Sequence, residues 1–217
     1  MFAHDRDLLV HEPGLLREAA WAGQKLFAGP VEVELGKLAV TSYSGLFDSD
    51  AARPGGVLLL DNAPVEILSI DHGFTASVSM IRARDSDQPL QAWWLGQNAD
   101  VECITFRPQI AMVHGVLLRA AGLVPGDTPH DQSTLGADRV TNPGDLRHAE
   151  AVGALAAVYA AAAPVADPTA DLFNKAKRYA DEFARVRRSL RVAVDTTGDG
   201  RPDDHRPSGV IQMKRTS

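Results

Sequence analysis

The strongest pattern in the chain is the apolar stripe of one long helix between residues 171 and 191. Apolar residues recur there at alternating steps of four and three, which places them on one side of a helix. The stripe consists of Leu172, Ala176, Tyr179, Phe183, Val186 and Leu190. A stripe of this kind is buried in a folded protein, so we expect it to pack against neighbouring helices.

Residues 31–106 have a different pattern, in which apolar and polar residues alternate and turns are frequent. Val31, Val33 and Leu35 alternate with glutamates, and Arg53-Pro54-Gly55-Gly56 and Asp71-His72-Gly73 have the composition of turns. The predicted strands are 31–35, 38–42, 57–60, 65–70 and 75–82, and the last strands are expected at Trp94 and at 101–106. Short strands separated by turns predict a small antiparallel β-barrel or sandwich.

Helical patterns flank this β region. Pro13 opens a short helix, Pro108 opens another that is closed by Gly122, and residues 146–163 form an alanine-rich helix ended by Pro164. The sequence therefore predicts an α+β fold in four parts. They are an N-terminal helical segment (1–30), a small β domain (31–106), an α-helical bundle (107–194) and an extended C-terminal tail (195–217).

Composition narrows the class of protein. The chain of 217 residues is 45% apolar and 23% charged, which is ordinary for a soluble globular protein. Its formal charge of −6 argues against a dedicated nucleic-acid binder. The single cysteine, Cys103, excludes an intrachain disulfide. No signal peptide is readable, and the longest apolar run is shorter than a membrane span, so we expect a soluble protein made in the cytoplasm, with no membrane partner.

The last helix also carries a local excess of positive charge. Residues 171–191 include seven basic and three acidic residues, so the net charge of this helix is positive whereas that of the whole chain is negative. The basic face consists of Lys175, Lys177, Arg178, Arg185, Arg187, Arg188 and Arg191. Two interpretations stay open, a solvated helix face or a surface for an acidic partner or a nucleic-acid channel.

The residues after this helix partly match a calcium-binding loop. The candidate ligands are Asp195, Thr197, Asp199, Arg201 and Asp203, which alternate around Gly200. The twelfth position, where such loops carry a bidentate glutamate, is Arg206. A polar turn with Gly198 and Gly200 at positive φ explains the same residues, so calcium is the only cofactor that the sequence suggests, and it does so weakly.

No pattern in the sequence predicts catalysis. The seven histidines lack zinc-site spacing, and Gly-x-Ser-x-Gly, phosphate-loop and dinucleotide-binding motifs are missing. Cys103 lies in an apolar strand and is expected in the core. We therefore expect that the protein is not an enzyme.

Both ends of the chain resemble a known family. Residues 5–17, Asp-Arg-Asp-Leu-Leu-Val-His-Glu-Pro-Gly-Leu-Leu-Arg, look like the start of proteins encoded beside portal and tail genes in tailed phages and prophages. Residues 172–179, continuing to Asp-Thr-Thr-Gly-Asp-Gly at 195–200, resemble the same proteins, and the helical half is similar in plan to head-tail connector (adaptor) proteins. No β region between Val31 and Phe106 is known to us in that family, so the tier of the neck stays open between adaptor, stopper and tail-completion protein.

The resemblance implies an architectural role in the neck of the virion. The protein would form a ring, usually of twelve copies, between the portal protein ring and the next neck or tail protein, with DNA passing through it. Protomers would bury the apolar stripe between them, and residues 195–217 would dock on the portal. The alternative is a small calcium-dependent or ligand-binding module that uses the loop at 195–203.

Overall fold

The computed structural model describes residues 1–34, 39–47, 52–91, 98–125, 135–164 and 171–208. They form two compact units. One unit, here called the barrel unit, contains His4–Arg107, and the other, the helical unit, contains Met1–Ala3 together with the chain from Pro108 onward. The α+β class predicted from the sequence is confirmed.

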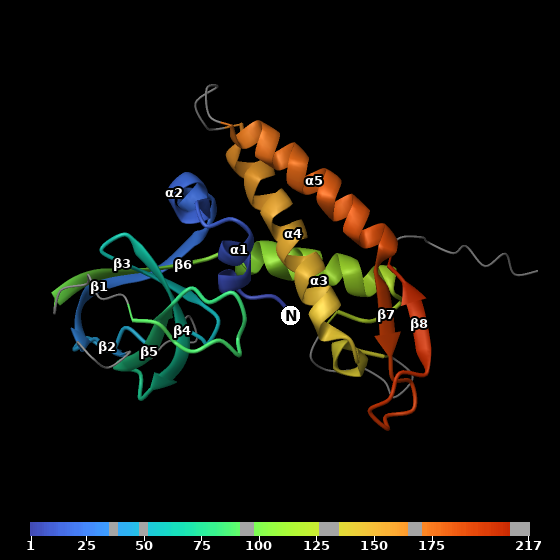
Figure 1. Cartoon of the computed structure of the whole chain (residues 1–217), viewed down its shortest axis with the longest axis horizontal. Coiled ribbons are helices and arrows are strands. Elements are labelled where there is room, and N and C mark those ends of the chain that lie inside the picture. The colour runs from blue at the N-terminus through green and yellow to red at the C-terminus, as the bar shows by residue number, and fades with distance from the viewer. Residues whose placement is uncertain (35–38, 48–51, 92–97, 126–134, 165–170, 209–217) are drawn as a thin grey trace, which may run out of the picture. The chain divides into compact units, whose positions relative to one another are not determined.

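Six antiparallel strands close into a barrel in the order β1-β2-β5-β4-β3-β6 (Figure 1). The strands are β1 (Gln24–Glu34), β2 (Ala39–Thr41), β3 (Val57–Leu60), β4 (Ala63–Asp71), β5 (Thr75–Met80) and β6 (Asn98–Thr105). Alternate residues such as Val31, Val33 and Val101 point inward and form the barrel core. Of the two predicted architectures, barrel or sandwich, the structure shows the barrel, while the strand predicted at Trp94 lies outside the described residues.

The predicted N-terminal segment (1–30) is not a part of its own. Helices α1 (Asp5–His11) and α2 (Leu15–Ala19) and the 3₁₀ turn η1 (Ala20–Ala22) belong to the barrel unit. Strand β1 begins at Gln24, seven residues before the predicted strand, because its first half pairs with β6 across a bulge between Lys25 and Phe27. Gly29 and Pro30 interrupt the alternation there, so the sequence pattern shows only the second half of the strand.

Buried charges hold α1 on the barrel. Glu66 on β4 is fully buried, and its two oxygens lie 2.6 Å from Nε of Arg6 and 2.6 Å from Nε of Arg82. Arg6 also pairs with Asp85. The carboxylate of Asp5 accepts hydrogen bonds from Thr105 Oγ1 and from the backbone N–H of Phe106, both at 2.7 Å. The motif Asp5-Arg6 is thus a structural element of the barrel unit.

The helical unit contains three long helices and a two-stranded sheet. The helices are α3 (Arg107–Ala120), α4 (Pro143–Ala162) and α5 (Leu172–Ser189), and the strands are β7 (Arg191–Val194) and β8 (Asp204–Pro207). A 3₁₀ turn, η2 (Ala137–Arg139), precedes α4. Helices α4 and α5 lie side by side and antiparallel (Figure 1), and the ring of Tyr159 stacks on Tyr179 with centroids 5.7 Å apart. Leu117, Leu146 and Val192 lie in one apolar core, so β7 packs with the helices.

A second fully buried glutamate ties the first residues of the chain to this unit. Glu150 on α4 accepts the backbone N–H groups of Phe2 and Ala3 at 2.9 and 2.8 Å through Oε2. Its Oε1 lies 2.6 Å from Nδ1 of His114 on α3. A buried carboxylate requires such partners, since burying it alone costs several kcal/mol.

The extended tail predicted from residue 195 does not begin there. Residues 195–203 form a turn, and β8 then pairs with β7 in the register Val192↔Arg206. Ser208 is buried, and its hydroxyl donates to the carbonyl of Arg187 at 3.0 Å. The chain folds back because this pairing satisfies the backbone groups of β7, a long-range effect that local sequence does not reveal. Residues 209–217, the rest of the predicted tail, lie outside the described residues.

The helices pack closely at Gly153, which suggests a test of this core. A Cβ atom at Gly153 would lie 2.7 Å from Val113 and 2.8 Å from Phe183. We expect Gly153→Ala to lower the free energy of unfolding by about 1–2 kcal/mol, because overpacking outweighs the better helix propensity of alanine. Gly144→Ala is the matched control in the same helix, since nothing lies within 4 Å of its Cβ position. Chemical denaturation measures both, and equal stability of the two variants would contradict the packing described.

The buried carboxylate of Asp5 predicts a pH dependence. Burial raises the pKa of Asp5 from 3.8 to about 6. The folded state therefore binds a proton more tightly than the unfolded chain, and this contribution to stability is complete below pH 3.8 and lost as the pH rises through 6. Between these values wild type should lose roughly 3 kcal/mol relative to Asp5→Asn. Denaturation at several pH values measures this difference. The exposed Asp100→Asn serves as control, and parallel pH profiles for wild type and Asp5→Asn would refute the prediction.

Candidate interaction surfaces

The apolar stripe of α5 packs against its own chain. Leu172, Tyr179 and Leu190 are buried, and the remaining three members of the stripe are half-buried. Phe183 and Val186 pack on the core that α3 and α4 share with β7. Because α4 already covers much of the stripe, a contact between protomers would have to use its half-buried members, and it stays a prediction.

The basic face of α5 faces solvent for most of its length. Lys177, Arg178, Arg185, Arg188 and Arg191 are exposed. The other two members, Lys175 and Arg187, are half-buried. The face is therefore an accessible surface of positive charge on the side of the helix that does not enter the core.

Local contacts hold several of these cations in place. The Nζ of Lys175 lies 5.5 Å from the ring centroid of Tyr159, and Cζ of Arg178 lies 4.6 Å from that of Tyr179, as in cation–π pairs. Arg185 pairs with Glu182 at 3.7 Å. The arrangement presents a surface of cations that can bind an anionic partner by charge.

Three of the predicted calcium ligands lie close together, because the hydroxyl of Thr197 donates to Oδ1 of Asp195 at 3.3 Å and is also a hydrogen-bond partner of Asp203. Both carboxylate oxygens of Asp195 accept backbone N–H groups, from Gly198 at 2.5 Å and from Gly200 at 2.7 Å. Asp203 accepts the N–H and the hydroxyl of Thr196, and Asp199 accepts the N–H of Arg201 at 2.9 Å. No cluster of three or more His, Cys, Asp or Glu side chains suited to a metal occurs within the described ranges.

The two glycines of this loop adopt the conformation that the polar-turn interpretation predicts, and the calcium interpretation stays a prediction. Gly198 and Gly200 have φ values of +87° and +80°, which strongly favour glycine. Burial acts to raise the pKa of Asp195, but the hydrogen bonds from the N–H groups of Gly198 and Gly200 outweigh it and hold the pKa below 3.8. Asp195 is thus the residue that organises the turn between β7 and β8.

Cys103 does not have the properties of a nucleophile. Its side chain is buried in the barrel core, and burial, together with the nearby carboxylate of Asp5, raises the pKa of the thiol to about 12. The thiolate is therefore scarce at neutral pH. Cys103 is a core residue, as the apolar strand pattern predicts.

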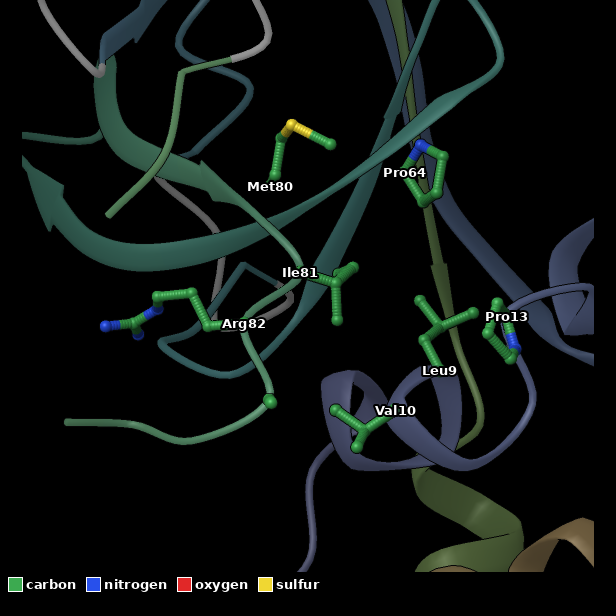
Figure 2. A pocket seen from close by; sticks show the side chains of 8 residues that line it. Leu9, Val10, Pro13, Pro64, Met80, Ile81 and Arg82 are labelled. Carbon is green, nitrogen blue, oxygen red and sulfur yellow. The ribbon is translucent and has the colours of Figure 1, made fainter. Parts of the chain in front are cut away.

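An apolar pocket of about 350 Å³ lies on the barrel unit. Figure 2 shows Leu9, Val10 and Pro13 on one side of it and Pro64, Met80 and Ile81 on the other. The guanidinium of Arg82 points away from these side chains (Figure 2). Sequence reasoning missed this pocket, because three segments far apart in the chain build it and no local pattern marks it.

Comparison with protein-family models, with curated proteins and with solved structures gave no match. The resemblance of the two chain ends to phage connector proteins therefore remains a sequence-based expectation. Among the helices of the described part of the chain, none combines the length and the apolar character needed to cross a membrane.

The geometry of Asp195 separates the two interpretations of the loop by experiment. We expect Asp195→Ala to lower the free energy of unfolding by about 1–3 kcal/mol, because backbone N–H groups lose their acceptor. Asp199→Ala, at an exposed position, should change it by less than about 0.5 kcal/mol. Thermal unfolding with and without calcium measures both, and calcium should leave the melting temperature unchanged. A melting temperature that rises with calcium in wild type but not in Asp195→Ala would restore the calcium-module alternative.

Proposed function

We propose that this chain is a structural virion protein, a head-tail connector that forms a ring between the portal and the tail of a phage or prophage. The observation that carries the proposal is the basic face of α5, which exposes five cations in a chain whose formal charge is −6. The resemblance of residues 5–17, 172–179 and 195–200 to phage neck proteins supports it. On this proposal the protein acts by assembly and needs no cofactor.

The helical unit supplies the docking surface in this proposal. Helices α3, α4 and α5 play the part of an adaptor-type bundle, and the outer face of α5 meets an acidic surface of the portal ring or lies near the DNA path. Because residues 195–203 form a turn and β8 pairs with β7, this proposal gives the docking role of the C-terminal end to residues 209–217. The next neck or tail protein binds the ring on its other side.

The basic face gives a direct test against a portal ring from the same genome. We expect the double variant Arg185→Glu/Arg188→Glu to weaken co-assembly with the portal at least tenfold, because reversed charge opposes an acidic surface. Arg17→Glu/Arg84→Glu makes the same change of net charge at exposed sites of the barrel unit and should co-assemble like wild type. Analytical ultracentrifugation of mixtures measures both, with circular dichroism as a check of folding.

The C-terminal end is tested in the same assay. A chain ending at Ser208 keeps β8 and its pairing with β7, so it should fold normally and lose portal binding. Truncation after Val194 would instead remove β8 and expose the edge of β7, which mixes a folding defect with a docking defect. A wild-type protein that ignores the portal ring would overturn the proposed function.

A further inference from the structure

Two features of the molecule are not used by the proposed docking on the portal. The first is Phe173 near the start of α5, whose exposed fraction is 74% although its neighbour Leu172 is buried. Lys177, Ala184 and Arg188 follow it at spacings of four, eleven and fifteen residues, so they share its side of the helix. This side therefore carries an exposed aromatic ring at one end and cations along its length.

The second feature is the apolar pocket of the barrel unit, and its size suits an aromatic ring. Its volume is about 350 Å³, whereas a cavity of about 150 Å³ suffices to hold benzene. The lining is apolar, and Arg82 is held by Glu66 Oε1 at 2.6 Å and by the carbonyls of Asp85 and Asp87 at 2.9 Å. The charge of Arg82 is thus already compensated, and the pocket favours a neutral ring.

The two units also differ in charge. Residues 4–107 contain fifteen acidic and eight basic side chains, whereas the rest of the chain contains thirteen acidic and fourteen basic ones. The barrel unit therefore repels a second barrel unit and attracts the basic face of α5. The pocket that suits an aromatic ring and the difference in charge both favour the same pairing. The helical unit of one molecule would bind the barrel unit of another.

We propose that Phe173 of one copy inserts into the apolar pocket of the barrel unit of a second copy, with Lys177, one helical turn further along α5, against the acidic barrel unit. This inference deepens the proposed function, because it names the surfaces that join protomers. The two surfaces differ, so the contact is head-to-tail and continues from copy to copy into a ring or a filament. A buried aromatic anchor within a charged rim is the usual composition of an energetic centre in an interface.

Single variants test the two halves of the contact in the absence of portal. Phe173→Ser removes the ring at an exposed position, and Val10→Trp fills the pocket from α1, where Val10 is 38% exposed. Each should weaken self-association roughly thirtyfold in sedimentation velocity, as loss of an interface anchor does. Met112→Ser, at a residue 55% exposed on α3, and Val10→Ala, which leaves the pocket open, are the matched controls and should associate like wild type. Added salt should weaken wild-type association.

Mixing the two variants gives the decisive measurement. A copy with Phe173→Ser keeps its pocket, and a copy with Val10→Trp keeps its phenylalanine. At a concentration between the dissociation constants of wild type and of the variants, each variant alone should be monomeric. An equal mixture should form a dimer that stops at two copies, since one intact contact remains. Formation of this dimer also shows that both variants are folded.

Three results would overturn the inference: a wild-type protein that stays monomeric, self-association that Phe173→Ser leaves unchanged, or a mixture of variants that fails to pair. The fate of the proposed function is read separately, from co-assembly with the portal. Self-association that depends on Phe173 without portal binding would leave the inference standing and reject the connector. If the protein binds the portal but its self-association does not depend on Phe173, the connector proposal stands and the inference about Phe173 is rejected.

Discussion

The barrel unit depends on the burial of one carboxylate. Glu66 has no exposed surface, and a charge in that position is tolerated only when cations reach it. Arg6 arrives from α1 and Arg82 from the segment after β5, so a single side chain fixes two parts of the chain that the barrel strands do not include. The apolar pocket exists because these two parts, with Leu9 and Ile81, are held facing β4.

Glu150 has the corresponding role in the helical unit. It is also fully buried, and it binds backbone N–H groups of the first residues of the chain as well as His114. The backbone N–H groups of Phe2 and Ala3 are therefore hydrogen-bonded inside the protein. Residues 5–7 look like a charged surface segment in the sequence, but they too are buried and have a structural role. The basic face of α5 is therefore the more informative charge pattern for function.

Sequence reasoning succeeded where one local period decides the structure. The alternation at Val31 and Val33 predicts the barrel, and the stripe from Leu172 to Leu190 predicts α5 and, by exclusion, its basic outer face. It failed where long-range pairing or buried polar residues decide. Helix α1 begins with buried charged residues that a hydrophobic pattern treats as exposed, and β8 forms only because β7 offers a partner.

The candidate sites follow the same division. The calcium hypothesis rests on the order of residues along the chain and stays a prediction, while the fold adds the hydrogen bonds that the oxygens of Asp195 accept from backbone N–H groups. The pocket combines side chains from α1, β4 and the end of β5, so only the fold reveals it. The sequence shows Phe173 as an apolar residue outside the stripe. Its exposure suggests an interface only once the fold shows a pocket that can receive an aromatic ring.

The strand edges affect how readily copies of the chain pair with one another through their backbones when many copies are close together. In the closed barrel each of the six strands pairs with two neighbours, and β8 ends in Pro207, which has no N–H to donate to an added strand. Both features reduce the number of strand edges to which another chain could add. Contacts between copies are left to side chains, whose identity is specific and whose strength a single substitution can adjust.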